Sequence, residues 1–549
     1  MPPCLALQLH TVPPEDSAVY DMICDADTIG VFQIESRAQM SMLPRLRPRC
    51  FYDLVIEVAI VRPGPIQGNM VHPYLRRRNG EEAVNFPSEA LRQVLQKTLG
   101  VPLFQEQAMR VAMVGANFSA EEADRLRRAM ASWRKSGVIE GFHQKIIDGM
   151  LANGYTREFA EQSFLQIRGF GEYGFPESHS ASFALLVYVS AWIKRHHPAG
   201  FCAALLNSQP MGFYAPAQIV RDARDHGVNV LPIDINHSDW DCTLENRRGG
   251  VSPPSSKTPA KLKSTWGLHG PAVRLGFRQV RGLRQADAER IAEVRKPFGI
   301  FTSIEQFHRV TALPRHVLEC LAEADAFRSL NLPRREALWQ VMALTDEDLP
   351  LFDEATVGCD SSQHENKGCN TLHPTVASIA DAARSFGVPQ DDISPRFSDS
   401  PIPFPLLPPM SLSQEVMTDY SKIGLSLKAH PLSLVRQTLA KMKLITAAQL
   451  QQLPQGRWVK IAGLVLVRQR PGTASGVVFA TIEDETGAAN LVIWSNIYDR
   501  FRGAARHATL LHADGYVERQ GQVVHVMAKR LFDLSHLLRE YNLRSRDFH

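Results

Sequence analysis

The sequence predicts a multidomain α+β protein that is mostly helical at first and ends in a small β-barrel. Its 549 residues exceed the roughly 250–300 residues at which a single hydrophobic core stops growing. Apolar residues recur at helical spacing up to about residue 345, whereas residues 451–535 alternate in five strand-like runs. Between them, residues 346–410 are a low-complexity linker dense in Ser, Asp, Asn and Pro.

Bulk composition excludes several classes of protein. A hydrophobic content of 44% is ordinary for a globular chain, and a net charge of +4 is too small to require a nucleic-acid partner, so charge has to be judged locally. No apolar run is long enough to span a bilayer, and the first basic residue, Arg37, comes too late for a secretory signal. The eight cysteines never form C-x-x-C, which predicts no structural zinc and a cytoplasmic location.

The first helical region contains a glycine-aromatic stretch, residues 169–175, followed by a long apolar run. Alternating glycines predict a tight loop, because only glycine adopts positive φ without steric cost. Residues 178–180, Ser-His-Ser, are predicted to cap a helix that continues through the apolar run 183–193. This run is apolar on every side, so the helix is expected to be buried and to end at Pro198.

Two basic segments precede that helix. In residues 61–80, Pro63 and Pro65 stiffen the backbone beside Arg62, whose guanidinium can bind phosphate oxygens in bidentate fashion. Three adjacent arginines follow, Arg76, Arg77 and Arg78, a pattern that by itself is usually solvated surface.

A capping box formed by Ser119 and Glu122 starts the second basic segment, a helix. Its predicted buried stripe is Ala123, Leu126, Met130 and Trp133. Its cations are Arg125, Arg127, Arg128, Arg134 and Lys135. An ordinary amphipathic surface helix and a helix that contacts a phosphate backbone both remain open at this point.

Two acidic pairs have a spacing that metal ligands can have. Asp25 with Asp27, and Asp239 with Asp241, have the D-x-D spacing that can hold two Mg²⁺ ions for phosphoryl transfer. Acids in such loops are more often turn or cap residues, so no metal site is predicted from either pair.

Residues 275–295 fit a helix-hairpin-helix, in which the backbone at a glycine turn contacts phosphate without reading sequence. Arg281, Gly282 and Arg284 are the predicted contacts. Residues 301–327 resemble a second repeat, which is expected to be structural because Glu323-Ala324-Asp325 replaces the glycine turn. The segment 246–265, rich in Gly, Pro, Ser and Lys, is predicted to be a flexible insertion.

The five strand-like runs of residues 451–535 suggest an OB-fold. Such barrels hold single strands in a basic groove by stacking bases on aromatic side chains. The aromatic candidates are Trp458, Phe479, Trp494 and Tyr516, of which half or more are expected in the core. Trp494 and Tyr516, with Arg468 and Arg470, are predicted to bind single-stranded DNA.

Five motifs occur in a family order: GVFQIES, VRPGPIQ, LFQEQ, ADRLRRAM and YGFPESHSASFALLVY. In this order they resemble the fingers of bacterial C-family DNA polymerases, which include polymerase III α subunits. The words PESHS and LLNSQPMGFY and the terminal SRDFH are closer to the error-prone, damage-inducible branch. The resemblance implies a DNA-directed DNA polymerase (a nucleotidyltransferase) that uses Mg²⁺ in translesion synthesis, DNA repair and damage-induced mutagenesis.

The resemblance also implies a division of the chain. After an N-terminal edge come the fingers, the insertion, tandem hairpins, the linker, a helical connector, the OB-fold and a tail. Their expected bounds are 1–20, 21–245, 246–265, 266–345, 346–410, 411–450, 451–535 and 536–549.

Nucleotide or DNA contacts in the fingers are implied for Arg62, Arg76, Arg77, Arg125, Arg127, Arg128, Lys135, Tyr173 and His179. Glu177 stands where the replicative branch often has a basic residue, and a carboxylate there would repel a triphosphate. The catalytic aspartates of the family lie in a palm domain N-terminal to these motifs. We therefore expect the Mg²⁺ ligands to lie outside this chain and the isolated chain not to polymerise.

The expected partners are primer–template DNA and an incoming deoxynucleoside triphosphate, with a sliding clamp and accessory mutagenesis proteins as further candidates. Leu349, Leu351 and Phe352 resemble a clamp-binding peptide, although Asp348 replaces its leading glutamine. Two alternatives remain: a non-catalytic DNA-binding remnant or split subunit, and a clamp-recruited interaction scaffold.

Overall fold

The computed structural model describes most of the chain. The described residues are 7–60, 73–131, 140–173, 176–210, 212, 214–246, 263–344, 407–470, 476–520, 523–541 and 546–548.

The N-terminal helices pack around one long helix, α10 (Glu177–His196). Against it lie α1 (Ser17–Cys24) and α3 (Phe51–Ile60), and α2 (Arg37–Leu46) packs on these two helices. A short 3₁₀ turn, η1 (Leu9–Thr11), precedes them. The shared core includes fully buried side chains of α1, α3 and α10. Burial of these apolar faces, rather than helix propensity, holds the unit together.

Two expectations for α10 are wrong. The helix begins at Glu177 directly after Pro176, so residues 178–180 lie inside it and cap nothing. Leu185 and Leu186 are 43% and 39% exposed, so the helix buries one face rather than its whole circumference. A sequence that is apolar all round does not show which side the neighbouring helices cover.

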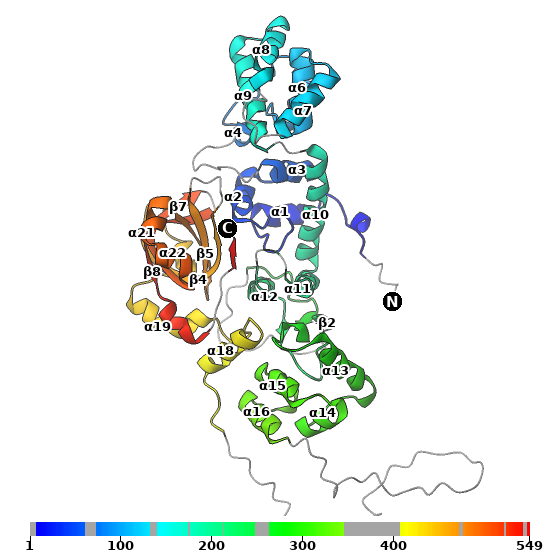
Figure 1. Ribbon diagram of the computed structural model, residues 1–549, viewed down its shortest axis with the longest axis vertical. Coiled ribbons are helices and arrows are strands. Elements are labelled where there is room, and N and C mark those ends of the chain that lie inside the picture. Colours follow the sequence, from blue (N-terminus) through cyan, green and yellow to red (C-terminus); the bar gives the residue numbers. More distant parts are fainter. Residues whose placement is uncertain are drawn as a thin grey trace, which may run out of the picture.

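A second helical bundle forms one end of the molecule (Figure 1). Its elements are α5 (Glu89–Leu95), η2 (Gln96–Thr98), α6 (Gln105–Ala116), α7 (Ala120–Ala131), η3 (Glu140–Phe142), α8 (His143–Ala152) and α9 (Arg157–Tyr173). The short helix α4 (Pro73–Arg78) precedes them in the chain and buries Tyr74 and Leu75 in the first core.

Of two local predictions for this bundle, the capping box is confirmed and the glycine loop is wrong. The capping box before α7 is confirmed, because Ser119 N donates to Glu122 and Glu122 N donates back to Ser119 Oγ. The predicted glycine loop is wrong over 169–173, since α9 continues to Tyr173. Glycine costs about 1 kcal/mol in a helix interior. The helix nevertheless persists beyond its buried turns at Phe164 and Ile167.

The next region joins two helices to a small sheet. α11 (Pro198–Asn207) and α12 (Pro216–Asp225) precede β1 (Val230–Leu231), β2 (Thr243–Glu245) and β3 (Ala272–Arg274). The order is β1-β3-β2, with β3 parallel to β1 and antiparallel to β2. The 246–265 segment therefore interrupts one sheet instead of separating two independent cores.

The hairpin helices form the opposite end of the molecule (Figure 1). They are η4 (Phe277–Gln279), α13 (Gln285–Phe298), α14 (Ile304–Thr311), α15 (Arg315–Glu323), η5 (Arg328–Leu330) and α16 (Arg334–Ala343). Four phenylalanines pack at their centre, with Phe307 edge-on to both Phe301 and Phe327.

The helical connector consists of α18 (Leu412–Lys422), α19 (Pro431–Lys441) and α20 (Ala447–Leu450). It docks on the hairpin region through the buried guanidinium of Arg334, which pairs with Asp419 and, at 3.0 Å, with Glu415. The packing places residues from both sides of the 346–410 linker in one polar cluster.

The C-terminal barrel confirms the predicted OB-fold. It contains β4 (Trp458–Gln469), β5 (Val478–Asp484), β6 (Gly487–Ile493), α21 (Ser495–Arg500), α22 (Arg502–His507), β7 (Leu510–Gln520) and β8 (Val523–Asp533). The order β5-β6-β8-β7-β4 is closed by pairing of β4 with β5. After η6 (Ser535–Tyr541), the short strand β9 (Arg546–Phe548) runs parallel to the end of β4.

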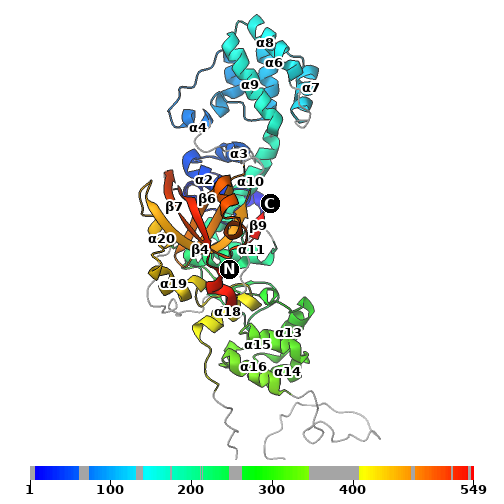
Figure 2. The same cartoon turned by 60° about the vertical axis from the view of Figure 1, so that its left-hand side comes forward.

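The barrel lies beside the middle of the elongated molecule, next to α2, α12 and the connector (Figures 1 and 2). An ion-pair junction fixes it there. Arg221 of α12 pairs with Glu483 and donates to the Asp484 carbonyl at 2.6 Å. Arg436 of α19 pairs with Glu485 at 2.5 Å and with Asp484 at 3.1 Å.

Among the described residues, every helix is too short or too polar to cross a lipid bilayer.

Candidate nucleic-acid interface

Helix α7 presents three of the predicted finger cations on its exposed surface. The side chains of Arg125, Arg127 and Arg128 are 59%, 42% and 67% exposed. Each pairs with a carboxylate one turn earlier on the same helix, Glu121 or Asp124. Exposed pairs of this kind contribute little to stability, so the guanidinium groups can exchange their partners for phosphate.

The triple arginine of α4 is more tightly held. Arg76 and Arg77 share the carboxylate of Glu82, at 2.9 and 2.8 Å. Arg77 also donates to the Leu99 carbonyl, and Arg78 binds Asp53 through two nitrogens. Arg76, with 41% of its side chain exposed, is the more accessible of the two predicted contacts.

Two finger motifs, LFQEQ and YGFPESHSASFALLVY, meet α3 where α10 begins. The Glu177 carboxylate accepts a hydrogen bond from Tyr52 Oη at 2.7 Å, and the Glu177 backbone N donates to Glu106 at 3.0 Å. Glu177 is therefore held against α3. The two carboxylates keep this corner acidic beside the predicted pocket residue His179, whose exposed ring lies 4.1 Å from that of Phe183.

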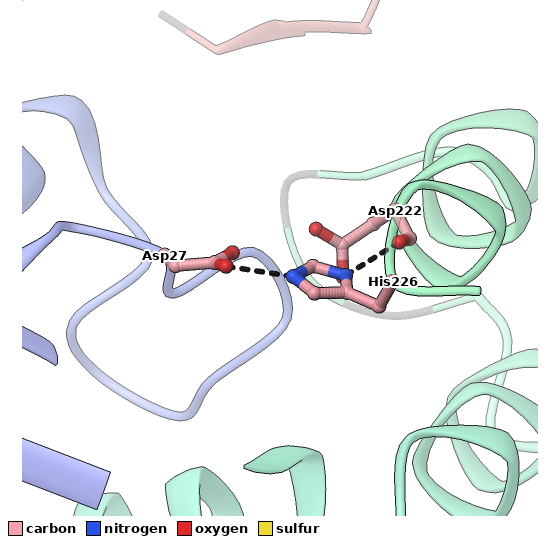
Figure 3. A group of neighbouring side chains, drawn as sticks. All are labelled: Asp27, Asp222 and His226. Carbon is pink, nitrogen blue, oxygen red and sulfur yellow. Dashed lines mark hydrogen bonds and ion pairs between the residues drawn. The ribbon is translucent and has the colours of Figure 1, made fainter. Parts of the chain in front are cut away.

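A buried charge cluster lies at the other end of α10 (Figure 3). His226 Nε2 is 2.6 Å from Asp27 Oδ2, and His226 Nδ1 is 2.6 Å from the Asp222 carbonyl. Lys194 Nζ is 2.8 Å from Asp222 and 3.4 Å from Asp27, and Lys263 reaches Asp27 at 2.6 Å. The cluster thus joins the loop after α1, α10, the end of α12 and Lys263 in the last residues of the predicted insertion.

Asp27, Asp222 and His226 have the separations of a metal site, but their chemistry fits ion pairs. Two ammonium groups already neutralise the carboxylates, and both histidine nitrogens face oxygen acceptors instead of a shared central point. Burial raises the pKa of Asp27, but Lys194, His226 and Lys263 outweigh it and hold that pKa well below its usual range. The expected turn or cap role of Asp27 is wrong, whereas Asp25 does form the C-cap of α1.

The second acidic pair is also engaged by cations. Asp239 pairs with Arg295 at 2.5 Å, and Asp241 pairs with Arg278 at 2.9 Å. Neither this pair nor the Asp27 cluster offers two free, convergent carboxylates, so the acids of the described ranges at these places do not fit the two Mg²⁺ ions of a polymerase.

The first hairpin has the predicted turn. Gly282 has φ of +90°, which explains the glycine, and α13 starts three residues later. Arg284 extends into solvent with 71% of its side chain exposed and pairs with Asp287. Arg281 differs from expectation, because its backbone N and guanidinium donate to the carbonyls of Lys422 and Ser421 and tie the hairpin to α18.

The second repeat uses Asp325 at the corresponding turn, with φ of +64°. Its carboxylate is buried and pairs with Arg328 at 2.6 Å and with Lys428 at 3.0 Å. The turn that would approach phosphate in a DNA-binding repeat is acidic and covered by the connector, which favours a structural role.

The four barrel residues predicted to bind single-stranded DNA lie in different environments. Arg468 does not fit a groove-lining role, because its buried guanidinium donates to the carbonyls of Ala505 and Ala508. Arg470 lies 5.0 Å from the Tyr498 ring, and Trp494, just after β6, is 47% exposed. Tyr516 is 44% exposed but lies on β7, opposite Trp458 of β4.

Several predicted site residues have no described structure. Arg62, Lys135, Leu349, Leu351 and Phe352 lie outside the described residues, as does the side chain of Tyr173.

Sequence reasoning missed Tyr52 and Lys194. Tyr52 gave no signal, since its partner Glu177 is 125 residues away. Lys194 appeared as one of several cations at a helix C-terminus, whereas its ammonium group is buried between two carboxylates.

Comparison with known families assigns the three regions. Residues 5–154 match the bacterial DNA polymerase III alpha subunit finger domain. Residues 227–337 match a helix-hairpin-helix motif, and residues 459–534 match an OB-fold nucleic acid binding domain. The chain has the finger, helix-hairpin-helix and OB-fold domains of the bacterial DNA polymerase III alpha family.

Curated relatives point to the error-prone branch. Error-prone DNA polymerase 1 of Agrobacterium fabrum is 50% identical over 542 residues, covering 98% of this chain and 45% of the relative. Error-prone DNA polymerase 1 of Rhizobium meliloti is 52% identical over 532 residues, covering 95% and 44%. The Alkalilimnicola ehrlichii enzyme is 50% identical over 545 residues, covering 99% and 47%. The chain spans slightly less than half the length of these relatives.

Proposed function

We propose that this chain forms the fingers, hairpin and OB-fold part of an error-prone DNA-directed DNA polymerase that acts in translesion synthesis, DNA repair and damage-induced mutagenesis. One observation carries the proposal: about 50% identity to enzymes named error-prone DNA polymerases runs through 98% of the chain, across all three regions. The remnant and scaffold alternatives have no comparable support, and the clamp-like peptide lies outside the described residues.

In this function the chain closes on the incoming nucleotide and binds primer–template DNA. The exposed guanidinium groups of α7 and α4 are placed against phosphate, as is Arg284 at the start of α13. The barrel holds single-stranded DNA. We place the polymerase in the cytoplasm, with the sliding clamp and accessory mutagenesis proteins as partners.

Mg²⁺ is the proposed cofactor, since polymerases of this class transfer a nucleotidyl group with divalent metal. The carboxylates of Asp27, Asp222, Asp239 and Asp241 are committed to ion pairs. Since the catalytic aspartates of the family lie in a palm domain N-terminal to the finger motifs, we place the Mg²⁺ ligands outside this chain. The 549-residue chain by itself is then expected to give no primer extension with Mg²⁺ and all four nucleotides. Extension by the purified chain would contradict this assignment.

Binding of a fluorescent primer–template, measured by anisotropy at several salt concentrations, tests the DNA contacts. Each phosphate contact contributes about −0.9 to the slope of log K against log salt. The double variant Arg125→Ala/Arg128→Ala should therefore lower the magnitude of the slope by about two. Lys441→Ala, an exposed cation of α19, is the control with an unchanged slope. If the double variant keeps the wild-type slope, α7 does not contact DNA.

A further inference from the structure

The barrel carries an ordered group of side chains on the outer surface of β4, β7 and β8. Strand pairing aligns them in three rungs: Trp458, Tyr516 and Met527; Lys460, Asp514 and Arg530; and Ala462, His512 and Phe532. The residues between them, such as Ile461, Ala513 and Val526, form the barrel core, so these nine side chains point away from that core. Ala462, His512 and Asp514 are nevertheless buried, Ala462 in the cluster under the connector. We call this surface the outer aromatic face.

Its aromatic side chains are accessible. Trp458, Tyr516 and Phe532 are 39%, 44% and 40% exposed. The rings of Trp458 and Tyr516 meet edge to face with centroids 4.7 Å apart, and Phe532 stacks on His512 at 4.8 Å. The outer rungs are four residues apart along β4 and β7, about 14 Å. Rings fixed by such contacts lose little side-chain entropy when a ligand stacks on them.

The charge of the face is positive. Its single acid, Asp514, is only 1% exposed and is shared by His512 at 2.7 Å and Arg530 at 2.8 Å. Lys460 lies in the same rung and Lys529 is exposed next to Arg530, whereas the half-buried Glu518 follows Tyr516 on the same side of β7, so the cations outnumber the acids by one. Burial lowers the pKa of His512; the hydrogen bond and charge of Asp514 raise it but do not outweigh burial and the charges of Lys460 and Arg530.

We propose that the outer aromatic face binds single-stranded DNA, with unpaired bases stacked on Trp458, Tyr516 and Phe532 and phosphates near Lys460 and Arg530. This deepens the proposed function by locating a single-strand site of the barrel. Exposed rings beside Lys460 and beside Arg530, whose ion pair with Asp514 leaves 53% of its side chain exposed, suit a ligand that has both π-faces and negative charge. Duplex DNA offers the charge but keeps its bases paired. Arg470 and Trp494 belong to a different surface, since Arg470 is twelve residues from Trp458, roughly 40 Å of extended chain.

The main test compares binding of fluorescent oligo(dT) and of a duplex of equal length to the full 549-residue chain. Trp458→Ala and Phe532→Ala should each weaken oligo(dT) binding about fivefold to a hundredfold, because a stacked base is lost, and leave duplex binding unchanged. Trp458→Phe keeps an aromatic platform and should stay within about threefold of wild type. Trp339→Ala removes an equally exposed tryptophan of α16 and is the matched control.

Crosslinking gives a second readout that does not depend on substitution. Oligo(dT) containing 5-iododeoxyuridine should photocrosslink to peptides that contain Trp458, Tyr516 or Phe532. Unchanged oligo(dT) affinity in Trp458→Ala with crosslinks elsewhere would overturn the proposal and leave the face to a protein partner. Equal loss of single-strand and duplex binding in Trp458→Ala and Phe532→Ala that keep the wild-type circular dichroism spectrum would also overturn it, because the rings would then not distinguish unpaired bases. Wild-type chain that binds neither DNA would instead contradict the proposed function as a whole.

Discussion

Lys194 provides the sharpest test of how α10, α12 and the loop after α1 are held together. Its ammonium group lies between Asp222 and Asp27 and donates to the Ile29 carbonyl at 3.1 Å, with only 2% of the side chain exposed. Lys194→Met keeps an unbranched stem of similar length but leaves buried carboxylates without their shared cation. Breaking a buried ion pair in this way costs roughly 3–5 kcal/mol of the free energy of unfolding.

The pH dependence of that loss follows from two pKa shifts. Burial lowers the pKa of Lys194, but Asp222 and Asp27 outweigh it and raise the pKa, so its stabilisation is present below the unfolded value of about 10.4 and is lost as pH rises through the folded value. The pKa of Asp27 is lowered, so its stabilisation is present above about 3.9 and is lost as pH falls. The deficit of the variant should be constant from about pH 5 to pH 9.

Hydrogen exchange measured by mass spectrometry reports the effect locally, which matters because a multidomain chain does not unfold in one step. Amides at the C-terminal end of α10 and in α12 should exchange about a hundredfold faster or more in Lys194→Met. Lys145→Met, which breaks an exposed pair with Glu122, is the control without effect. Lys194→Met/Asp222→Asn should recover much of the loss. A change below about threefold at α10 would refute the reasoning.

Three further outcomes are expected. Arg284→Ala should lower the magnitude of the slope of log K against log salt for primer–template binding by about one. Arg281→Ala should leave that slope unchanged, because its guanidinium binds a carbonyl of the connector. Equal slopes for the two variants would contradict the assignment. Burial raises the pKa of Glu35 to about 7, so the free energy of unfolding falls as pH rises from about 4.3 through 7. Glu35→Gln should therefore raise the melting temperature at pH 8 but not at pH 4. A gain in melting temperature that does not depend on pH would contradict this. Tyr52→Phe should lower the free energy of unfolding by about 1 kcal/mol and speed amide hydrogen exchange at the start of α10. Unchanged exchange there would show that the Tyr52–Glu177 hydrogen bond does not hold the start of α10.

The sequence by itself determined the local structure and the family. The Ser119–Glu122 capping box and the glycine at position 282 are set by contacts within one or two turns. Helical spacing alone showed that Ala123, Leu126 and Met130 share one face, which the neighbouring helices bury. The alternating strands of the barrel were predictable for the same reason, since a two-residue period shows directly which side chains face the core.

The tertiary structure decided how charged side chains are used. Lys194 and Asp27 are 167 positions apart, and Arg281 bonds to Ser421, across the linker. Arg468 looked like a surface cation in an alternating strand, but α22 covers it and accepts its hydrogen bonds. An ionisable group contacts DNA, an ion-pair partner or the core according to what packs against it, and that depends on segments far away in the chain. The same holds for Trp458 and Phe532, which come together only because β7 lies between β4 and β8.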